Sequence, residues 1–228
     1  FQSYMQEYGY YDIFLINAQT GHVIYTAAKE SDYGANLKYG SLKDSGLGRV
    51  FANTLNTNKP TFQDMKPYAP SNNAPAMFLG TPIFKDGNVE AVLVFQISDK
   101  SINNIMQFRK GYGLSQEDYL VGQDKLMRSD SYLDKKNHSL KASFANPSLG
   151  KVETKASINA LKGKTNTEIV IDYNGNPVLS AYSPLTIGAQ PNEPIFDHTT
   201  TWRSPDLCHC AGPAKKTTPR QAICHPRP

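Results

Sequence analysis

The sequence predicts an α+β fold of two successive units, each built on an antiparallel sheet with flanking helices. Three observations support this prediction. Apolar and aromatic runs of strand length occur in pairs separated by short turns. Apolar residues at helical spacing lie between those pairs. The order hairpin, helical segment, hairpin then occurs twice along the chain.

Residues 1–108 are predicted to form the first unit. Residues 1–9 have the composition of a helix end, because Gly9 readily takes the left-handed conformation that terminates a helix. The Asp86-Gly87 pair between two apolar runs is the strongest hairpin signal in the chain. Strands are expected over residues 10–17, 22–28, 77–84 and 89–97.

Helices and loops are expected between these strands. Four apolar residues recur at helical spacing before Pro60, which ends the helix: Leu47, Val50, Phe51 and Leu55. A second helix is expected after Ser98, which is a suitable N-cap residue. Residues 29–40 are predicted to be a polar loop, and the Pro- and Asn-rich residues 61–75 are predicted to be an irregular connection.

Residues 109–189 repeat the same order in shorter form and are predicted to form the second unit. Residues 130–150 are expected to be a polar loop, and residues 152–161 a short helix that ends at Gly163. Strands are expected over residues 118–122, 126–129, 168–173 and 178–185.

Residues 190–228 break this pattern. All three Cys, the only Trp and seven of the fifteen Pro lie there, and apolar periodicity is absent. The composition predicts an irregular tail, disordered or non-native, such as read-through from a frameshift or a cloning junction.

Composition also bounds the function. The net charge of +4, from 24 basic and 20 acidic residues, is small and spread along the chain, so nucleic acid is not an expected partner. Residues 1–190 contain no Cys, so this part needs no disulfide. The apolar stretches are far too short to cross a bilayer, so any membrane anchors are expected outside this fragment.

Four segments then carry a resemblance to a known family. Residues 10–37 (YYDIFLINAQTGHVIYTAAKESDYGANL) and 45–51 (SGLGRVF) resemble the membrane-distal module of bacterial double-Cache sensor domains. Residues 118–130 (DYLVGQDKLMRSD) and 176–185 (NPVLSAYSPL) resemble the membrane-proximal module. The resemblance covers nearly all of residues 8–189. In this family each Cache module is a PAS-like sheet, and a long helix leads from the membrane into the distal module, with residues 1–9 similar to its end. The proximal module of the family continues after residue 188 with a further strand and a helix, so the resemblance implies that the second unit lacks its last strand and is weakened by an unpaired sheet edge.

The resemblance implies a role as well as a fold. Such domains are the extracytoplasmic, periplasmic parts of inner-membrane methyl-accepting chemotaxis proteins and related receptors. The expectation is a small metabolite bound in the distal module, signalling to a cytoplasmic output, and a homodimer in the full receptor, with no cofactor, no metal and no enzymatic activity. The alternatives are the sensor region of a histidine kinase or nucleotide cyclase, or an enzyme on a PAS scaffold.

The same resemblance places the ligand between the strands and the following loop of the distal module. Lys29 and Asp32 in that loop can pair with a zwitterionic ligand or with each other, and a solvated surface loop is the competing interpretation. For the strand residues, core packing is the competing interpretation. A ligand pocket needs mostly apolar walls, and these residues have that composition. The expected ligand-binding residues are Tyr25, Lys29, Asp32, Tyr33, Met77, Phe78, Phe95 and Gln96.

The positions of the arginines do not identify the ligand. The amino-acid-binding members of the family use a Trp and an Arg close together in the distal module, but residues 1–108 contain no Trp. Arg49 falls on a predicted helix and Arg109 at the junction of the modules. Arg128, with Tyr119 and Tyr173, can serve a second site in the proximal module. The competing interpretation is an ion pair of Arg128 with one of two nearby carboxylates, Asp130 or Asp172.

Three other chemistries are disfavoured. The Gly163-Lys164-Thr165 run lacks the preceding Gly of a phosphate-binding loop, because position 158 is Ile. A zinc site from Cys208, Cys210, Cys224 and His225 has a spacing one residue short of the usual one. The two His outside the tail stand in turn or loop contexts and no nucleophile elbow is present, so no catalytic residue is expected.

Overall fold

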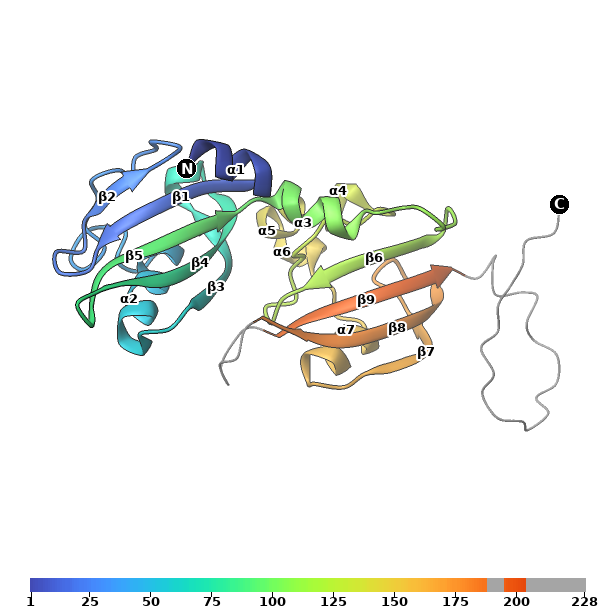
Figure 1. The fold of residues 1–228 in the computed structure, drawn as a ribbon. Coiled ribbons are helices and arrows are strands. Elements are labelled where there is room, and N and C mark those ends of the chain that lie inside the picture. Colours follow the sequence, from blue (N-terminus) through green and yellow to red (C-terminus); the bar gives the residue numbers. More distant parts are fainter. Residues whose placement is uncertain (188–194, 204–228) are drawn as a thin grey trace, which may run out of the picture.

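The structure, a computed structural model, describes residues 1–187 and 195–203. It contains two antiparallel sheets, each with its own flanking helices, arranged one after the other along the molecule (Figure 1). This is the predicted α+β class. The predicted boundary at residue 108 falls between the two sheets, and the division of the chain into modules at that point stays a prediction.

The first sheet has five strands in the order β2-β1-β5-β4-β3. Its central strand β5 pairs with β1 on one side and β4 on the other. The strands are β1 (Tyr10–Asn17), β2 (Val23–Thr26), β3 (Thr61–Tyr68), β4 (Ala74–Lys85) and β5 (Asn88–Ile97). The helices of this half are α1 (Gln2–Tyr8), α2 (Gly46–Thr57), the short 3-10 helix η1 (Ala69–Ser71) and α3 (Asp99–Met106).

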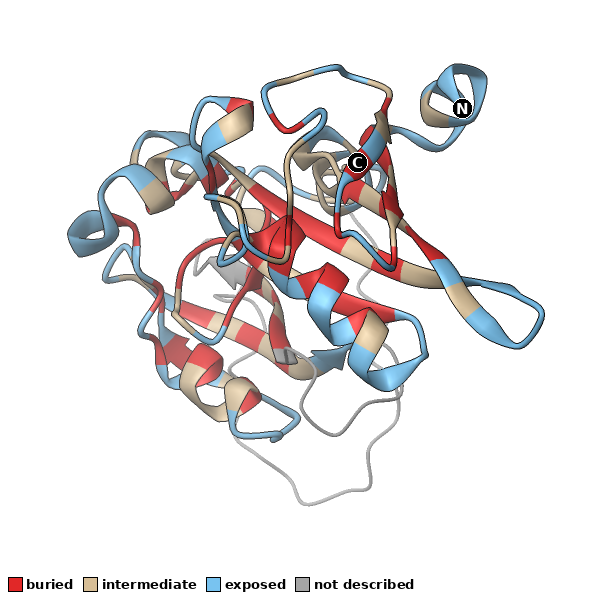
Figure 2. Ribbon diagram, turned by 90° about the vertical axis from the view of Figure 1, so that its left-hand side faces the viewer, coloured by how far each residue is buried: buried red, intermediate tan, exposed pale blue. Residues whose placement is uncertain are grey.

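Helix α2 covers one face of this sheet. Its first turn is capped by Ser45, whose side chain accepts a hydrogen bond from the Gly48 amide. The apolar stripe of the helix is buried, and its other side is exposed (Figure 2). That stripe packs on strand residues with the same facing to form the main core, which contains Phe14, Ile16, Leu47, Val50, Phe51, Tyr68, Phe78, Val92 and Val94.

The second sheet has four strands in the order β6-β9-β8-β7. They are β6 (Gln116–Val121), β7 (Asn166–Ile171), β8 (Pro177–Thr186) and β9 (Ile195–Arg203). The helices of this half are α4 (Lys135–His138), α5 (Leu140–Ala145), α6 (Pro147–Gly150) and α7 (Lys155–Leu161). Helix α7 packs against this sheet through Ala156 and Ala160.

Strand β9 corrects the prediction for the tail. Residues 190–228 were expected to be irregular, and the second unit to lack its last strand, but residues 195–203 form a strand between β6 and β8. Alternate residues of this strand, Asp197, Thr199 and Thr201, are buried. The Pro and Cys content of the tail concealed this short run of β-branched residues with strand propensity. The four candidate zinc ligands of the tail lie outside the described residues.

Three further expectations for loops and strands were wrong. Residues 61–68 form β3, which tolerates Pro67 because β3 is an edge strand. Residues 126–129 were expected to be a strand but make only an isolated bridge, from Met127 to Val121. Residues 130–150, expected to be a loop, contain α4, α5 and α6, whose lengths of four to six residues leave too little apolar periodicity to detect.

The two halves share an apolar interface. Phe62 and Met77 of the first sheet lie in one cluster with Leu140 of α5 and Phe196 of β9. The rings of Phe62 and Phe196 meet edge to face, with their centroids 6.0 Å apart. None of the helices in the described part of the chain is long and apolar enough to span a membrane.

Candidate ligand-binding site

The loop between β2 and α2, residues 27–40, is fixed to the first sheet by a buried carboxylate. We call it the capping loop. Asp12 of β1 is fully buried, and its Oδ1 accepts hydrogen bonds from the amides of Ala27 (2.8 Å) and Ala28 (2.9 Å). Its Oδ2 accepts one from the Thr26 hydroxyl. Because both oxygens are satisfied, Asp12 holds the start of the capping loop in place.

Asp32 lies further along the capping loop and is also fully buried. Its Oδ2 accepts a hydrogen bond of 2.8 Å from the Tyr68 hydroxyl, and its Oδ1 has no partner. Burial raises the pKa of the Asp32 carboxyl, and the neighbouring charges of Asp12 and Glu30 raise it further, while the Tyr68 hydrogen bond opposes the rise. The site therefore contains a buried carboxylate oxygen that lacks a donor.

A second set of polar groups continues from Glu30. The Glu30 carboxylate accepts hydrogen bonds from Tyr11 (2.6 Å) and Ser71 (2.8 Å). The Ser71 hydroxyl in turn accepts one from the Gln96 side-chain amide at 3.2 Å. The Oε1 atom of Gln96 is buried and has no partner. Asp12, Glu30 and Asp32 together are called the acidic cluster below.

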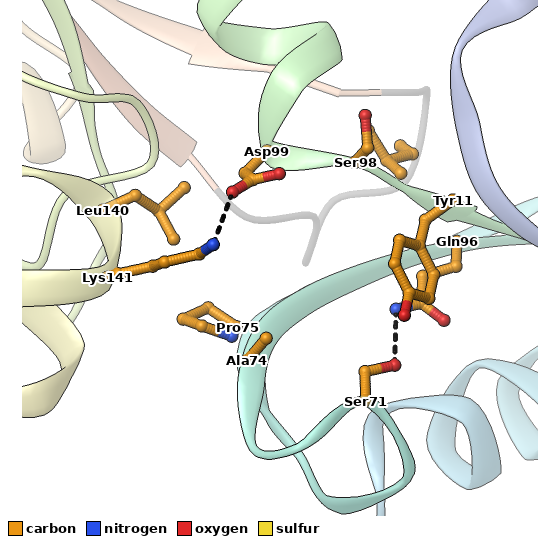
Figure 3. Close-up of a pocket in the computed structure, with 10 residues that line it drawn as sticks. Tyr11, Ser71, Ala74, Pro75, Gln96, Ser98, Asp99, Leu140 and Lys141 are labelled. Atoms are coloured by element: carbon orange, nitrogen blue, oxygen red, sulfur yellow. Dashed lines mark hydrogen bonds and ion pairs between the residues drawn. The ribbon is translucent and has the colours of Figure 1, made fainter. Parts of the chain in front are cut away.

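A cavity of about 90 Å³ borders this hydrogen-bonded chain (Figure 3). Tyr11, Ser71 and Gln96 line it from the first half of the molecule, and Leu140 and Lys141 of α5 line it from the second half. At its rim the Lys141 ammonium lies 3.5 Å from the Asp99 carboxylate. Figure 3 shows this pair and the Gln96–Ser71 hydrogen bond at opposite sides of the cavity.

An open groove of about 700 Å³ adjoins this cavity and shares Tyr11, Ser71 and Lys141 with it. The cavity alone is smaller than the roughly 300–1,000 Å³ of ordinary small-molecule pockets. A metabolite that reaches Gln96 therefore has to occupy part of the groove as well, or to displace the capping loop.

The structure divides the predicted ligand-binding residues between the two faces of the sheet. Asp32, Phe78 and Gln96 lie on the face covered by α2 and the capping loop. There the Phe78 ring packs against Tyr68 at a centroid distance of 5.0 Å. These three are the predicted residues that the fold brings together around the acidic cluster.

The other strand residues of the prediction face away from the acidic cluster. Phe95 packs on Tyr10 of β1 at 4.6 Å between ring centroids. Tyr25 packs on Phe1 at 5.2 Å, and Met77 lies in the apolar interface with the second half. Adjacent strand residues point to opposite faces, so the side chain of Phe95 faces away from that of Gln96.

The remaining two predicted residues, Lys29 and Tyr33, are exposed on the capping loop, with Tyr33 61% exposed. Ligand contact by any of the eight predicted residues stays a prediction. The polar network also contains four residues that are not among the eight predicted ones: Tyr11, Glu30, Tyr68 and Ser71. Tyr68 and Ser71 lie where an irregular connection was expected, and no local pattern marks them.

Arg128 forms a buried ion pair, with partners other than those considered from the sequence. Its guanidinium pairs with Asp64 of β3 at 2.6 Å and with Asp124 at 2.9 Å. The expected alternative partners make other contacts: Asp130 accepts from the Leu140 amide, and Asp172 accepts from backbone amides of its own turn. An ion pair was the right class of interaction, but its partners were wrong.

The other two arginines considered from the sequence lie elsewhere. Arg49 donates to the Asp44 carbonyl on the exposed side of α2. Arg109 donates to the carbonyls of Gly113 and Gln116, and its guanidinium lies 3.6 Å from the Tyr132 ring centroid. In the part of the chain that the structure describes, neither the Asp12, Glu30 nor Asp32 carboxylate forms an ion pair with a Lys or Arg.

The two successive sheets with their flanking helices define the class of the fold, which is that of Cache-type chemoreceptor ligand-binding domains. No protein-family model matches the chain, and no curated protein matches it. Solved structures do match.

One is the ligand-binding domain of the Pseudomonas fluorescens chemoreceptor CtaA in complex with L-isoleucine, with a TM-score of 0.54 and 14% identity over 87% of this chain and 71% of that one. The amino-acid chemoreceptor PctB of Pseudomonas aeruginosa, in complex with L-Gln, has a TM-score of 0.53 and 12% identity over 88% and 71%. An extracellular ligand-binding receptor from Desulfohalobium retbaense has a TM-score of 0.53 and 14% identity, over 85% of this chain and 30% of that one.

Proposed function

We propose that this chain is the extracytoplasmic sensing domain of a transmembrane chemoreceptor and that its ligand is a small organic cation. The fold supports the first part, because the similar structures are receptor ligand-binding domains and not enzymes. A periplasmic location, anchors in the inner membrane, a homodimer in the full receptor and signalling to a cytoplasmic output belong to the same proposal.

One observation carries the ligand class: two buried acceptor atoms in the site lack donors. These atoms are Oε1 of Gln96, which lines the cavity, and Oδ1 of Asp32, which lies in the capping loop and lines neither the cavity nor the groove. An unpaired buried acceptor costs about 1–3 kcal/mol, which a ligand recovers if it supplies N–H groups. The three acidic side chains Asp12, Glu30 and Asp32 make a positive charge on that ligand favourable.

The similar structures indicate only part of the chemistry of the ligand. The CtaA and PctB domains hold amino acids, which carry an ammonium and a carboxylate. Among the residues that the structure describes, Lys141 is the only basic side chain that lines the cavity, at its rim and beside Asp99. An amine without a carboxylate therefore fits the site better than an amino acid does.

A thermal-shift screen of the whole chain with amines, amino acids, organic acids, purines and sugars tests this proposal. Saturable stabilisation is expected from amines, and a ligand at 100 times its Kd adds about 2.7 kcal/mol to the free energy of unfolding. The matched variants are Asp32→Asn, which should lose the shift, and Asp86→Asn in an exposed turn, which should keep it. Stabilisation by organic acids alone would contradict the ligand class, and turnover of any compound would contradict the sensor function.

A further inference from the structure

A buried ion pair joins the two halves of the molecule. The Nε and Nη2 atoms of Arg128 donate to the two carboxylate oxygens of Asp64, at 2.8 and 2.6 Å. Arg128 lies after β6 in the second half, and Asp64 lies on β3 in the first. The Arg128 residue is fully buried, so this two-pronged contact is shielded from water and from salt.

The rest of the Arg128 side chain is fixed to its own half. Its Nη1 donates to the Leu126 carbonyl at 3.0 Å and pairs with Asp124. Gly122 leaves the space that the guanidinium occupies, because a Cβ at that position would lie 2.1 Å from Nη2. Arg128 is therefore bound at once to the turn over residues 122–127 and to Asp64.

Asp64 lies at an irregular point of β3. The pairing register of β3 with β4 shifts between Gln63 and Lys66, so Asp64 and Met65 have no partner residue in the ladder. Ladder hydrogen bonds hold a strand in place, and their interruption lets this short segment adjust. Four residues further on, the same strand ends at Tyr68, which donates to Asp32 of the capping loop.

The apolar interface between the halves does not provide the same directional link. The contacts of Phe62 and Met77 with Leu140 and Phe196 are apolar and therefore non-directional. The Asp64–Arg128 pair has fixed geometry, and a buried ion pair of this kind contributes little net stability compared with an apolar replacement. Fixed geometry therefore distinguishes the Asp64–Arg128 pair from the apolar contacts between the halves.

We propose that β3 links the acidic cluster to the second half, with Tyr68 at the end of the strand, Asp64 in its middle and the Asp64–Arg128 ion pair as the joint. A change at Asp32 shifts Tyr68, the shift passes along β3, and the turn over residues 122–127 moves with Arg128. That such a change accompanies ligand binding rests on the proposed function, but the link itself exists without a ligand.

A double-mutant cycle read by amide hydrogen exchange in the whole chain tests the link. Tyr68→Phe removes the hydrogen bond to Asp32 and serves as the perturbation. In the wild-type background it should change the exchange rates of the Gly122 and Arg128 amides about fivefold, the lower end of ordinary coupling between sites. These amides donate to Leu126 and Leu120, within and beside the turn.

The second arm of the cycle removes the joint. In an Asp64→Leu/Arg128→Met background, which replaces both charges so that neither is left buried alone, Tyr68→Phe should leave the two amides unchanged. Asp64→Glu, which keeps the charge but alters the reach, should reduce the response if the double replacement fails to fold. Tyr39→Phe at a tyrosine that is 84% exposed is the matched control and should have no effect in either background.

An equal response to Tyr68→Phe with and without the ion pair would overturn the proposal, as would no response in the wild-type background. Because no ligand is added, this result is independent of the screen for amines. Loss of the link would leave the ligand proposal intact, and a failed screen would leave the link intact.

Discussion

The Tyr68 hydroxyl donates a 2.8 Å hydrogen bond to Oδ2 of Asp32 and so joins the end of β3 to the capping loop. The other oxygen of the same carboxylate has no donor. The fold therefore satisfies one oxygen of this buried carboxylate and leaves the other without a hydrogen-bond donor. Burial of a carboxylate in this state costs folding free energy, which is the usual signature of a functional site.

Asp32→Asn is expected to stabilise the chain at pH 7 by about 1 kcal/mol while abolishing amine binding. The raised pKa of Asp32 means that the folded state holds its proton more tightly than the unfolded state. Its contribution is therefore most favourable below the unfolded pKa and is lost as the pH rises through the folded pKa. Urea unfolding at pH 7 measures this change, and a less stable variant would show that the carboxylate is needed for folding.

Asp197 on β9 is expected to make the stability of the second half depend on pH. Burial raises the pKa of its carboxyl to about 7, and its Oδ2 has no partner. The contribution of Asp197 to stability should be fully present below about pH 4, the pKa of an unfolded Asp, and should be lost as the pH rises through about 7. Unfolding midpoints of wild type and Asp197→Asn from pH 4 to 8 test this, because the variant should lack the decline and be about 1 kcal/mol more stable at pH 8.

An exposed acid provides the control for that series. Asp86→Asn lies in the β4–β5 turn and should retain the wild-type decline with pH. If Asp197→Asn also retained the decline, another group would have to be responsible for it.

Strand β9 is expected to be essential for the second sheet. A chain that ends at residue 194 loses the strand that pairs with both β6 and β8, so the ladder is broken in its centre. Such a chain should show the unfolding of the first half only, whereas a chain that ends at Arg203 should retain both. Far-UV circular dichroism and exchange protection of residues 116–121 distinguish the two. Full protection in the shorter chain would show that β9 is dispensable.

Asp12→Ala is expected to release the capping loop. The substitution leaves the Ala27 and Ala28 amides without their acceptor, and loss of a buried acceptor of this kind costs about 1–3 kcal/mol. Exchange at these two amides should rise far more than exchange in the centre of β5. A uniform rise across the first sheet would instead indicate global destabilisation.

The sequence was sufficient to predict the strands and the helix that have strong local patterns. The Asp86-Gly87 turn between two apolar runs predicted the β4–β5 hairpin, and helical spacing before Pro60 predicted α2. These signals are local, because a turn type or a helical stripe involves residues close together in the chain. Strand β9 was missed because its nine residues lie within a Pro- and Cys-rich tail.

The candidate site was predictable only in part, because its residues come together from distant segments. Asp32 and Gln96 were chosen for their position beside or on a strand, and both lie in the site. Phe95 was chosen on the same ground and faces the opposite side of the sheet. Whether a strand residue faces α2 or the other side depends on which face of the sheet the helix covers. Tyr68 was not predicted because the strand that contains it, β3, was expected to be an irregular connection.

The most direct test is calorimetric titration of the amine that gives the largest thermal shift into wild type and Asp32→Asn. We expect saturable binding to wild type at one site, with affinity that increases as the pH rises through the raised pKa of Asp32, because the ionised carboxylate binds the cation. Asp32→Asn should bind at least about 100-fold more weakly, as for a buried charge-assisted contact. Equal affinity of the two proteins, or affinity that does not change with pH, would contradict a ligand site centred on Asp32.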